Sequence, residues 1–169
     1  LVASMNPCPC GYLHHPTRQC MCTPAQVHRY MNKVSGPLMD RIDIQIEVQS
    51  VPFEDISEAP KGESSAVIRE RVLKARQIQI ERYRDVKGVH CNSQMTTALL
   101  QKYVQLAPQA TDLLRTAMKK FNLSARAYDR ILRVARTIAD LEGTDNVELG
   151  HIAEAIGYRN LDRDNWIDG

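Results

Sequence analysis

The stretch LSARAYDRILRVARTIADLEG at residues 123–143 decides the predicted fold class. Ser124 is a suitable helix start, because its hydroxyl can accept a hydrogen bond from a backbone amide of the first turn. The apolar residues that follow recur at helical spacing: Ala127, Ile131, Val134, Ala135 and Ile138. A helix with one apolar face must bury that face against other elements. The stretch therefore predicts one helix of a packed bundle.

Helical patterns continue on both sides of this stretch. Residues 64–83 are rich in strong helix formers, Gly88 interrupts the pattern, and Pro108 can open a new helix. The residues expected to face inward are Ile68, Val72 and Ala75, then Met95, Leu99, Tyr103 and Leu106, then Ala110, Leu113, Leu114, Ala117 and Phe121, and finally Ile152, Ala155 and Ile156. Consecutive amphipathic helices of this kind predict an all-α bundle.

The N-terminal third of the chain follows other patterns. Residues 1–5 are an apolar run before Asn-Pro, which predicts a short buried strand. Thr23-Pro24 predicts the start of a helix, and Ser35-Gly36-Pro37 is expected to end it. A second strand is predicted where apolar and polar residues alternate, at Ile42, Ile44, Ile46 and Val48.

The predicted fold class is thus an α/β part with short strands, a helix and a Cys-rich loop, followed by an all-α helical bundle. The α/β part is assigned to residues 1–52, with a Cys-rich insertion at 7–23. A loop-like stretch at 53–63 is predicted to be a linker, 64–160 the bundle, and 161–169 a tail.

Composition narrows the class of protein. The chain has 169 residues, of which 43% are hydrophobic and 25% charged, a mixture typical of soluble globular proteins. No apolar run reaches the roughly 20 residues that a membrane span needs. The net charge of +2 is too small to indicate nucleic-acid binding by itself. An uneven count of five cysteines suits a reducing compartment, so we predict a cytoplasmic protein.

Four cysteines are arranged as two C-x-C pairs separated by nine residues: Cys8, Cys10, Cys20 and Cys22. Four thiolates can hold Zn²⁺ in a closed, structural site that would help to order the loop. Paired cysteines of zinc sites usually have two to four residues between them, so C-x-C is a tighter pair than normal. His14 or His15, in the intervening loop, could replace one thiolate. The alternatives are unligated thiols, an adventitious disulfide and redox chemistry. Redox chemistry is the weakest of these, because no C-x-x-C motif lies beside a helix start. Cys91, beside His90, is interpreted as a bystander.

Two arginines are candidates for binding phosphate. Arg41 lies at the predicted junction of loop and strand, where a permanently charged, bidentate side chain could reach a neighbouring subunit. The alternative is a surface arginine paired with Asp40 or Asp43. Arg126 lies in the first turn of its predicted helix, whose positive end favours an anion.

Arg130 and Arg133 share a helix face with Arg126, at spacings of i+4 and i+7. We interpret these two as a solvated basic face. Asp129 precedes Arg133 by four residues and can form an exposed ion pair with it.

In their order, several stretches resemble the Mg-chelatase-like AAA+ ATPases of the bacterial ComM/YifB type. They are LVASMNPCPCGY at 1–12, CTPAQVHRYMNKVSGPLMDRIDIQIEV at 22–48, GESSAVIRERVLKAR at 62–76 and 123–143. The resemblance implies that the α/β part is a remnant of an AAA+ core and that the bundle is the AAA+ lid. It also implies ATP and Mg²⁺ as ligands of the intact protein, a ring of identical subunits, and DNA as the partner in transformation or recombination.

The resemblance further implies roles for three residues. Asn6 matches the sensor-1 residue that positions the attacking water, and Arg41 matches the arginine finger given to the adjacent subunit's ATP. Arg126 matches the sensor-2 arginine, which reaches phosphate in its own subunit. An arginine supplied in trans can contribute about 10³–10⁵ in rate.

The sequence departs from the family in lacking G-x-x-x-x-G-K-[ST] and an acidic Walker B strand. In the family both motifs lie upstream of the stretches matched here, so the resemblance implies that they precede this chain, and we predict that this chain alone is inactive. The alternative function is a zinc-stabilised, non-catalytic module that binds nucleic acid. The scarcity of aromatic residues, 5%, speaks against that alternative.

Overall fold

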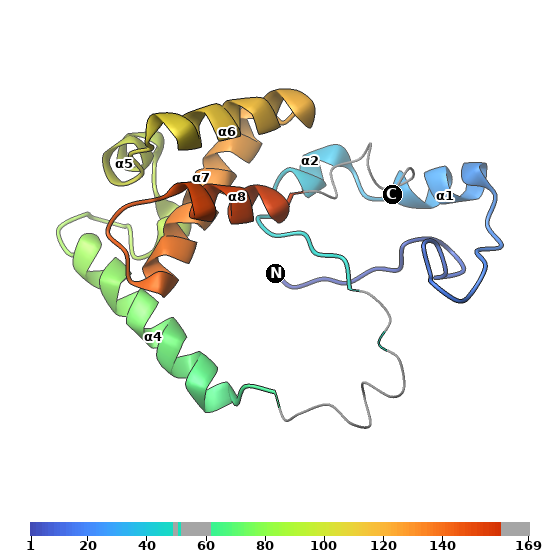
Figure 1. Cartoon of the computed structure of the whole chain (residues 1–169), viewed down its shortest axis with the longest axis horizontal. Helices are drawn as coiled ribbons and strands as arrows, with labels where there is room; N and C mark the ends of the chain where they lie inside the picture. Colours follow the sequence, from blue (N-terminus) through green and yellow to red (C-terminus); the bar gives the residue numbers. More distant parts are fainter. Residues whose placement is uncertain (49–50, 52–61, 160–169) are drawn as a thin grey trace.

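The computed structural model describes residues 1–48, 51 and 62–159. The predicted tail and most of the predicted linker therefore lie outside the described residues. The helices are α1 (Pro24–Met31), α2 (Gly36–Met39), α4 (Ser65–Arg82), α5 (Thr97–Tyr103), α6 (Pro108–Lys120), α7 (Ala125–Glu142) and α8 (Leu149–Gly157), with a 3₁₀ turn η1 (Asn92–Gln94) between α4 and α5. Figure 1 shows α4 to α8 gathered in one part and α1 and the N-terminal loop in another.

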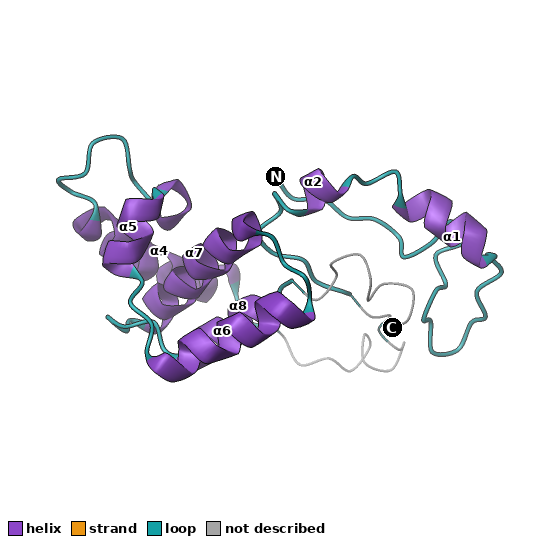
Figure 2. Cartoon of the chain, turned by 90° about the horizontal axis from the view of Figure 1, so that it is seen from above, coloured by secondary structure: helices purple, strands orange, loops and turns teal. Residues whose placement is uncertain are grey.

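The bundle is built around α7, which packs against α8, α4, α5 and η1, while α6 packs against α8 (Figure 2). Seventeen buried residues form its apolar core. The prediction that Ala127, Ile131 and Ile152 face inward is confirmed, since each is no more than 1% exposed. The predicted all-α bundle is therefore confirmed.

Local capping chemistry explains where the helices begin. The hydroxyls of Ser64, Thr96 and Ser124 each accept a hydrogen bond from a backbone amide in the first turn of α4, α5 and α7. Thr23 forms a reciprocal capping box with Gln26 at the start of α1. The predicted starts at Thr23, Ser64 and Ser124 are confirmed. The first helix ends sooner than predicted, at Met31, and the separate α2 follows Ser35.

The prediction of two strands is wrong for the described residues, none of which is in a strand. Residues 1–5 are exposed, and Ile44, Ile46 and Val48 are 50%, 64% and 82% exposed. Strand alternation specifies which face is buried but supplies no partner for the backbone, and a strand needs a neighbour to bond with. The predicted α/β part therefore contains no sheet among the described residues.

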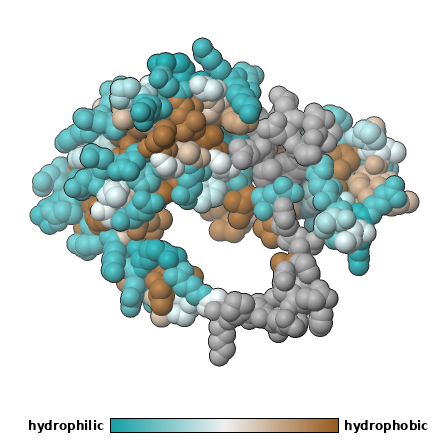
Figure 3. Space-filling model, viewed as in Figure 1, coloured by the Kyte–Doolittle hydropathy of each residue, from teal (hydrophilic) through white to brown (hydrophobic). Residues whose placement is uncertain are grey.

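A second correction concerns α4. Ala75 is buried as predicted, but Ile68 and Val72 are 41% and 46% exposed. The C-terminal half of α4 lies against the bundle, whereas its N-terminal half extends beyond it (Figure 1). Figure 3 shows the resulting hydrophobic side chains on the outer part of this helix.

A network of polar residues, for which no role was predicted, lies beside the apolar core. The Asp140 carboxylate is fully buried and accepts hydrogen bonds from Arg82 (2.7 Å), Asn92 (2.8 Å) and Arg136 (3.1 Å). Arg136, 1% exposed, also donates to the carbonyl of Thr144. The network joins α4, η1 and α7, and its residues satisfy one another's hydrogen-bonding groups.

In the part of the chain that the structure describes, none of the helices has the length and apolar character needed to cross a membrane.

Candidate functional site

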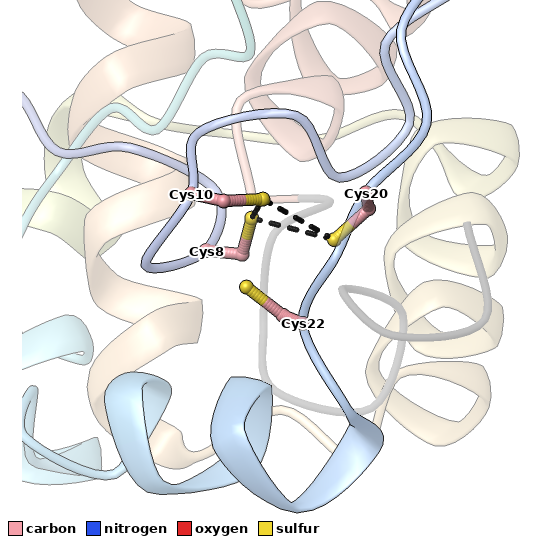
Figure 4. A group of neighbouring side chains, drawn as sticks. All are labelled: Cys8, Cys10, Cys20 and Cys22. Carbon is pink, nitrogen blue, oxygen red and sulfur yellow. Dashed lines mark hydrogen bonds between the residues drawn. The ribbon is translucent and has the colours of Figure 1, made fainter.

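The structure gathers the four predicted cysteines into one cluster (Figure 4). The Sγ atom of Cys8 is 3.4 Å from that of Cys10 and 3.7 Å from that of Cys20, and Cys10 to Cys20 is 3.6 Å. All four sulfur atoms, including that of Cys22, lie within 4.8 Å of one another. A tetrahedral Zn²⁺ site with Zn–S bonds of about 2.3 Å has sulfur atoms about 3.8 Å apart. The spacing therefore fits a metal with four thiolate ligands.

Tight turns of the backbone make this convergence possible. The amide of Gly11 donates to the carbonyl of Cys8 (3.0 Å), and Gly11 has φ of +81°, a conformation that glycine adopts without strain. Cys20 and Cys22 come from the chain that leads into α1, whose Thr23 cap fixes its start (Figure 4). Cys8 is fully buried, whereas the other three cysteines of the cluster are partly exposed.

The cluster contains no histidine among the described residues. Nδ1 of His15 instead accepts hydrogen bonds from the amides of Thr17 (3.2 Å) and Arg18 (3.1 Å). The His15 ring also meets the Tyr12 ring edge to face, with centroids 5.6 Å apart. The geometry supports four cysteines as the ligand set, rather than three cysteines and one histidine.

The environment of the thiols differs from one to the next. Backbone hydrogen bonds to Cys10, above all from Tyr12, lower its pKa to about 6. Burial raises the pKa of Cys22 to about 12. A metal ion binds thiolates and displaces their protons, so metal binding would require the deprotonation of Cys22 as well as of Cys10.

Asn6 and Arg41 are both exposed, and they lie in different surroundings. Asn6 precedes the cysteine loop, and its side chain lies close to Gly11: a Cβ atom at position 11 would lie 3.8 Å from the Asn6 side chain. Arg41 follows α2, and its guanidinium donates to the carbonyl of Pro37 (2.6 Å). Both residues thus lie on the surface, and no contact between them is seen among the described residues.

The three arginines of α7 have separate environments. Arg126 is exposed in the first turn. Arg130 forms an ion pair with Asp43, and Arg133 donates to the carbonyl of Met95 (2.9 Å). Arg133 also lies 3.6 Å from Asp129, which confirms the predicted pair, although both side chains are partly buried and not exposed as predicted. The interpretation of Arg130 and Arg133 as a solvated face is wrong, since both bind other segments.

Three arginines that bind other segments were not predicted from the sequence: Arg82, Arg136 and Arg159. Arg136 and Asp140 are four residues apart on a helix, a spacing that signals a pair and could have identified them. Arg159 is 2% exposed and donates to the carbonyl of Ile42 (2.7 Å), a contact between residues distant in the chain that leaves no local signal. Cys91 lies apart from the cluster, with its sulfur 3.1 Å from the hydroxyl of Ser93.

Comparison with known proteins links the chain to a family. Residues 1–56 match the family described as magnesium chelatase, subunit ChlI, and residues 62–159 match magnesium chelatase, subunit ChlI C-terminal. The competence protein ComM of Haemophilus influenzae is 41% identical over 164 residues, which are 96% of this chain and 31% of that protein. The uncharacterized protein YifB of Escherichia coli is 37% identical over the same shares.

The second match covers more than half of the chain, and it coincides with the helical bundle. The chain spans 31% of the length of both relatives. The expected family is therefore confirmed: the chain belongs to the family of the magnesium chelatase subunit ChlI, and ComM and YifB are among its relatives.

Proposed function

We propose that this chain is the nucleotide-responsive C-terminal part of a ring-forming AAA+ ATPase. In this proposal the bundle is the lid, Arg126 contacts phosphate in its own subunit, and Arg41 contacts the ATP of the adjacent subunit. Asn6 positions the attacking water. ATP is the substrate, and Mg²⁺ would neutralise phosphate charge in the intact protein.

The observation that carries this proposal is the exposure of Arg41 and Arg126 beside firmly held neighbours. Each guanidinium has five N–H donors and a permanent charge, so it can bind two phosphate oxygens at once. Arg126 adds the positive end of an eighteen-residue helix, which also favours an anion. Membership of the magnesium chelatase family supports a nucleotide as the ligand of these two arginines.

Arginine replacements in the intact ATPase test this proposal. Arg41→Ala should lower the turnover number about 10³-fold or more, because an arginine finger acts on the transition state, and should leave nucleotide binding in place. Arg126→Ala should weaken nucleotide binding itself. Arg115→Ala is the matched control, since Arg115 is an exposed bundle arginine paired with Asp112. Normal turnover in Arg41→Ala would remove Arg41 from the reaction.

We also propose that the cysteine cluster holds a structural Zn²⁺. The four sulfur atoms already lie near tetrahedral spacing, and a site with four protein ligands has no open position for catalysis. When bound, the ion would fix the loop between Asn6 and α1. Elemental analysis of freshly purified protein should find one zinc per chain, and Cys8→Ser should abolish it while Cys91→Ser should not. Zinc well below one per chain in the unaltered protein would refute the site.

DNA is the proposed target of the ring, in transformation or recombination. One relative carries the name competence protein, and the proposal extends that name to this chain. The turnover of the intact protein should rise when DNA is added. An unchanged rate with single-stranded, double-stranded and branched DNA would contradict this target.

A second candidate function is direct nucleic-acid binding by the cysteine loop. Residues 1–39 contain no Asp or Glu, and Arg18 lies 5.2 Å from the centre of the Tyr12 ring. Four thiolates around Zn²⁺ would carry a charge of −2, which reduces the basic character of this segment. Fluorescence anisotropy of this chain with oligonucleotides should show salt-dependent binding that Arg18→Gln weakens. Absence of binding at low salt would exclude this candidate.

A further inference from the structure

The segment that carries Arg41 is attached to the bundle on both sides of that residue. Arg159, just after α8, donates to the carbonyl of Ile42 (2.7 Å) and lies 4.0 Å from the Asp40 carboxylate. On α7, Arg130 forms an ion pair with Asp43. Bundle residues thus hold the neighbours of Arg41, while Arg41 itself is exposed.

A backbone contact strengthens the same attachment. The amide of Gln45 donates to the carbonyl of Tyr158 (2.8 Å), and the Gln45 side chain donates to the carbonyl of Met39 (3.2 Å). Gln45 is 8% exposed, whereas Ile44 and Ile46 on either side are 50% and 64% exposed. The polar residue faces inward and the apolar residues face outward, so hydrogen bonding decides how this segment lies on the bundle.

The two arginine contacts differ in burial. The Arg159 side chain is 1% exposed, so its hydrogen bond to the carbonyl of Ile42 and its attraction to the Asp40 carboxylate are shielded from solvent. Arg130 is 26% exposed and Asp43 49%, so their ion pair adds little to stability. Arg159 therefore anchors the segment, and the Arg130 pair is suited to adjusting its position.

Arg130 also shares a helix face with Arg126, the residue proposed to contact phosphate. The two are four residues apart on α7, a rise of about 6 Å along the axis. Because α7 is one continuous helix, a displacement of its first turn would move Arg130 as well. Arg130 is paired with Asp43, which is two residues from Arg41.

We propose that Arg130 and Asp43 link the two nucleotide contacts of the chain: α7 transmits the state of the phosphate at Arg126 to the position of Arg41. Arg130 is a positioning residue in this scheme, and it touches neither ATP nor the reacting atoms. Nucleotide bound to one subunit thereby regulates hydrolysis in the next subunit of the ring. This inference rests on the proposed roles of Arg41 and Arg126.

Steady-state kinetics of the intact ATPase with Arg130→Gln test the link. The turnover number should fall about 10- to 100-fold, because a small misplacement of a catalytic group has that effect, while KM for ATP stays unchanged. The reversed pair Arg130→Asp with Asp43→Arg should recover most of the loss. Arg115→Gln on α6, which breaks an exposed pair with Asp112, should change neither parameter.

Hydrogen exchange provides the structural readout and guards against simple unfolding. In Arg130→Gln the amides of residues 40–45 should exchange faster, with the core amides of α7 unchanged. Arg159→Gln should have a larger effect on the same segment, since it removes the buried anchor.

The outcomes separate this inference from the proposed function. If Arg41→Ala leaves turnover intact, the role of Arg41 fails and this inference fails with it. If Arg41→Ala abolishes turnover but Arg130→Gln keeps a normal turnover number, only the link is overturned. Loss of activity in Arg130→Gln that the reversed pair does not recover would also overturn it.

Discussion

The bundle and the N-terminal segment are ordered by different forces. The described residues 62–159 bury a contiguous apolar core together with the Asp140 network. Residues 1–48 bury only Cys8 and Val27 among their hydrophobic side chains. They instead contain the cysteine cluster and make polar contacts with α7 and with Arg159, just after α8. One region thus has its own apolar core, whereas the other has a cysteine cluster and polar contacts with the first.

Removal of the metal should produce the largest difference between the two regions. A chelator should release the proposed zinc, and residues 7–23 should lose protection against hydrogen exchange, because structural zinc contributes about 10–16 kcal/mol to the folding of small sites. The bundle should keep its protection and its urea midpoint. Cys91→Ser should respond to the chelator as the unaltered chain does. Simultaneous loss of protection in the bundle would contradict the comparison.

Within the bundle, Asp140→Asn should destabilise strongly. It leaves the guanidiniums of Arg136 and Arg82 without their carboxylate, and breaking a buried ion pair costs about 3–5 kcal/mol. The control is Asp112→Asn, whose side chain is 67% exposed, with an expected cost of about 0–1 kcal/mol. Urea unfolding followed by circular dichroism measures both. Equal costs would show that the buried network adds nothing.

The same apolar replacement in the two regions should have unequal effects. Ile131→Ala removes a side chain that is 1% exposed and should cost about 2–5 kcal/mol. Ile44→Ala removes one that is 50% exposed and should cost about 0.5 kcal/mol or less. Urea midpoints of the two variants provide the test. A large loss in Ile44→Ala would mean that this segment is buried in a contact that the isolated chain does not display.

The smallest effect is a pH-dependent difference among the cysteines of the metal-free chain, which tests whether the turns around Cys10 persist without the metal. The pKa of Cys10 is lowered to about 6, so its thiolate is present above that pH and is lost as the pH falls through it. The pKa of Cys22 is raised to about 12, so this thiol stays protonated at neutral pH. Brief alkylation followed by mass spectrometry should label Cys10 before Cys22 at pH 7. Equal labelling would contradict these environments.

Much of the bundle could be predicted from the sequence because its signals are local. A capping hydroxyl at Ser124 and apolar spacing through Ile131 and Ile138 act within one helix, and both were confirmed. The cysteine cluster was equally predictable, since four thiols within fifteen residues can meet through turns alone. Its metal remains a prediction.

The errors concern features that depend on distant parts of the molecule. The alternation around Ile44 and Ile46 predicted a strand, but a strand forms only where a second backbone accepts its hydrogen bonds. The amide of Gln45 instead finds the carbonyl of Tyr158, more than a hundred residues away. Arg159 was missed for the same reason, because its partner at Ile42 lies far from it in sequence.

The central claim is that Arg41, held by the bundle of its own subunit, acts on the ATP of the next one. Mixing two inactive variants of the intact protein tests it most directly: Arg41→Ala, which lacks the finger, and Asn6→Ala, which keeps Arg41 and Arg126 but cannot position the attacking water at its own ATP. In mixed rings, an Asn6→Ala subunit supplies Arg41 to the intact site of an Arg41→Ala neighbour, so turnover should rise well above that of either variant alone. A mixture no more active than the two variants measured separately would contradict the claim.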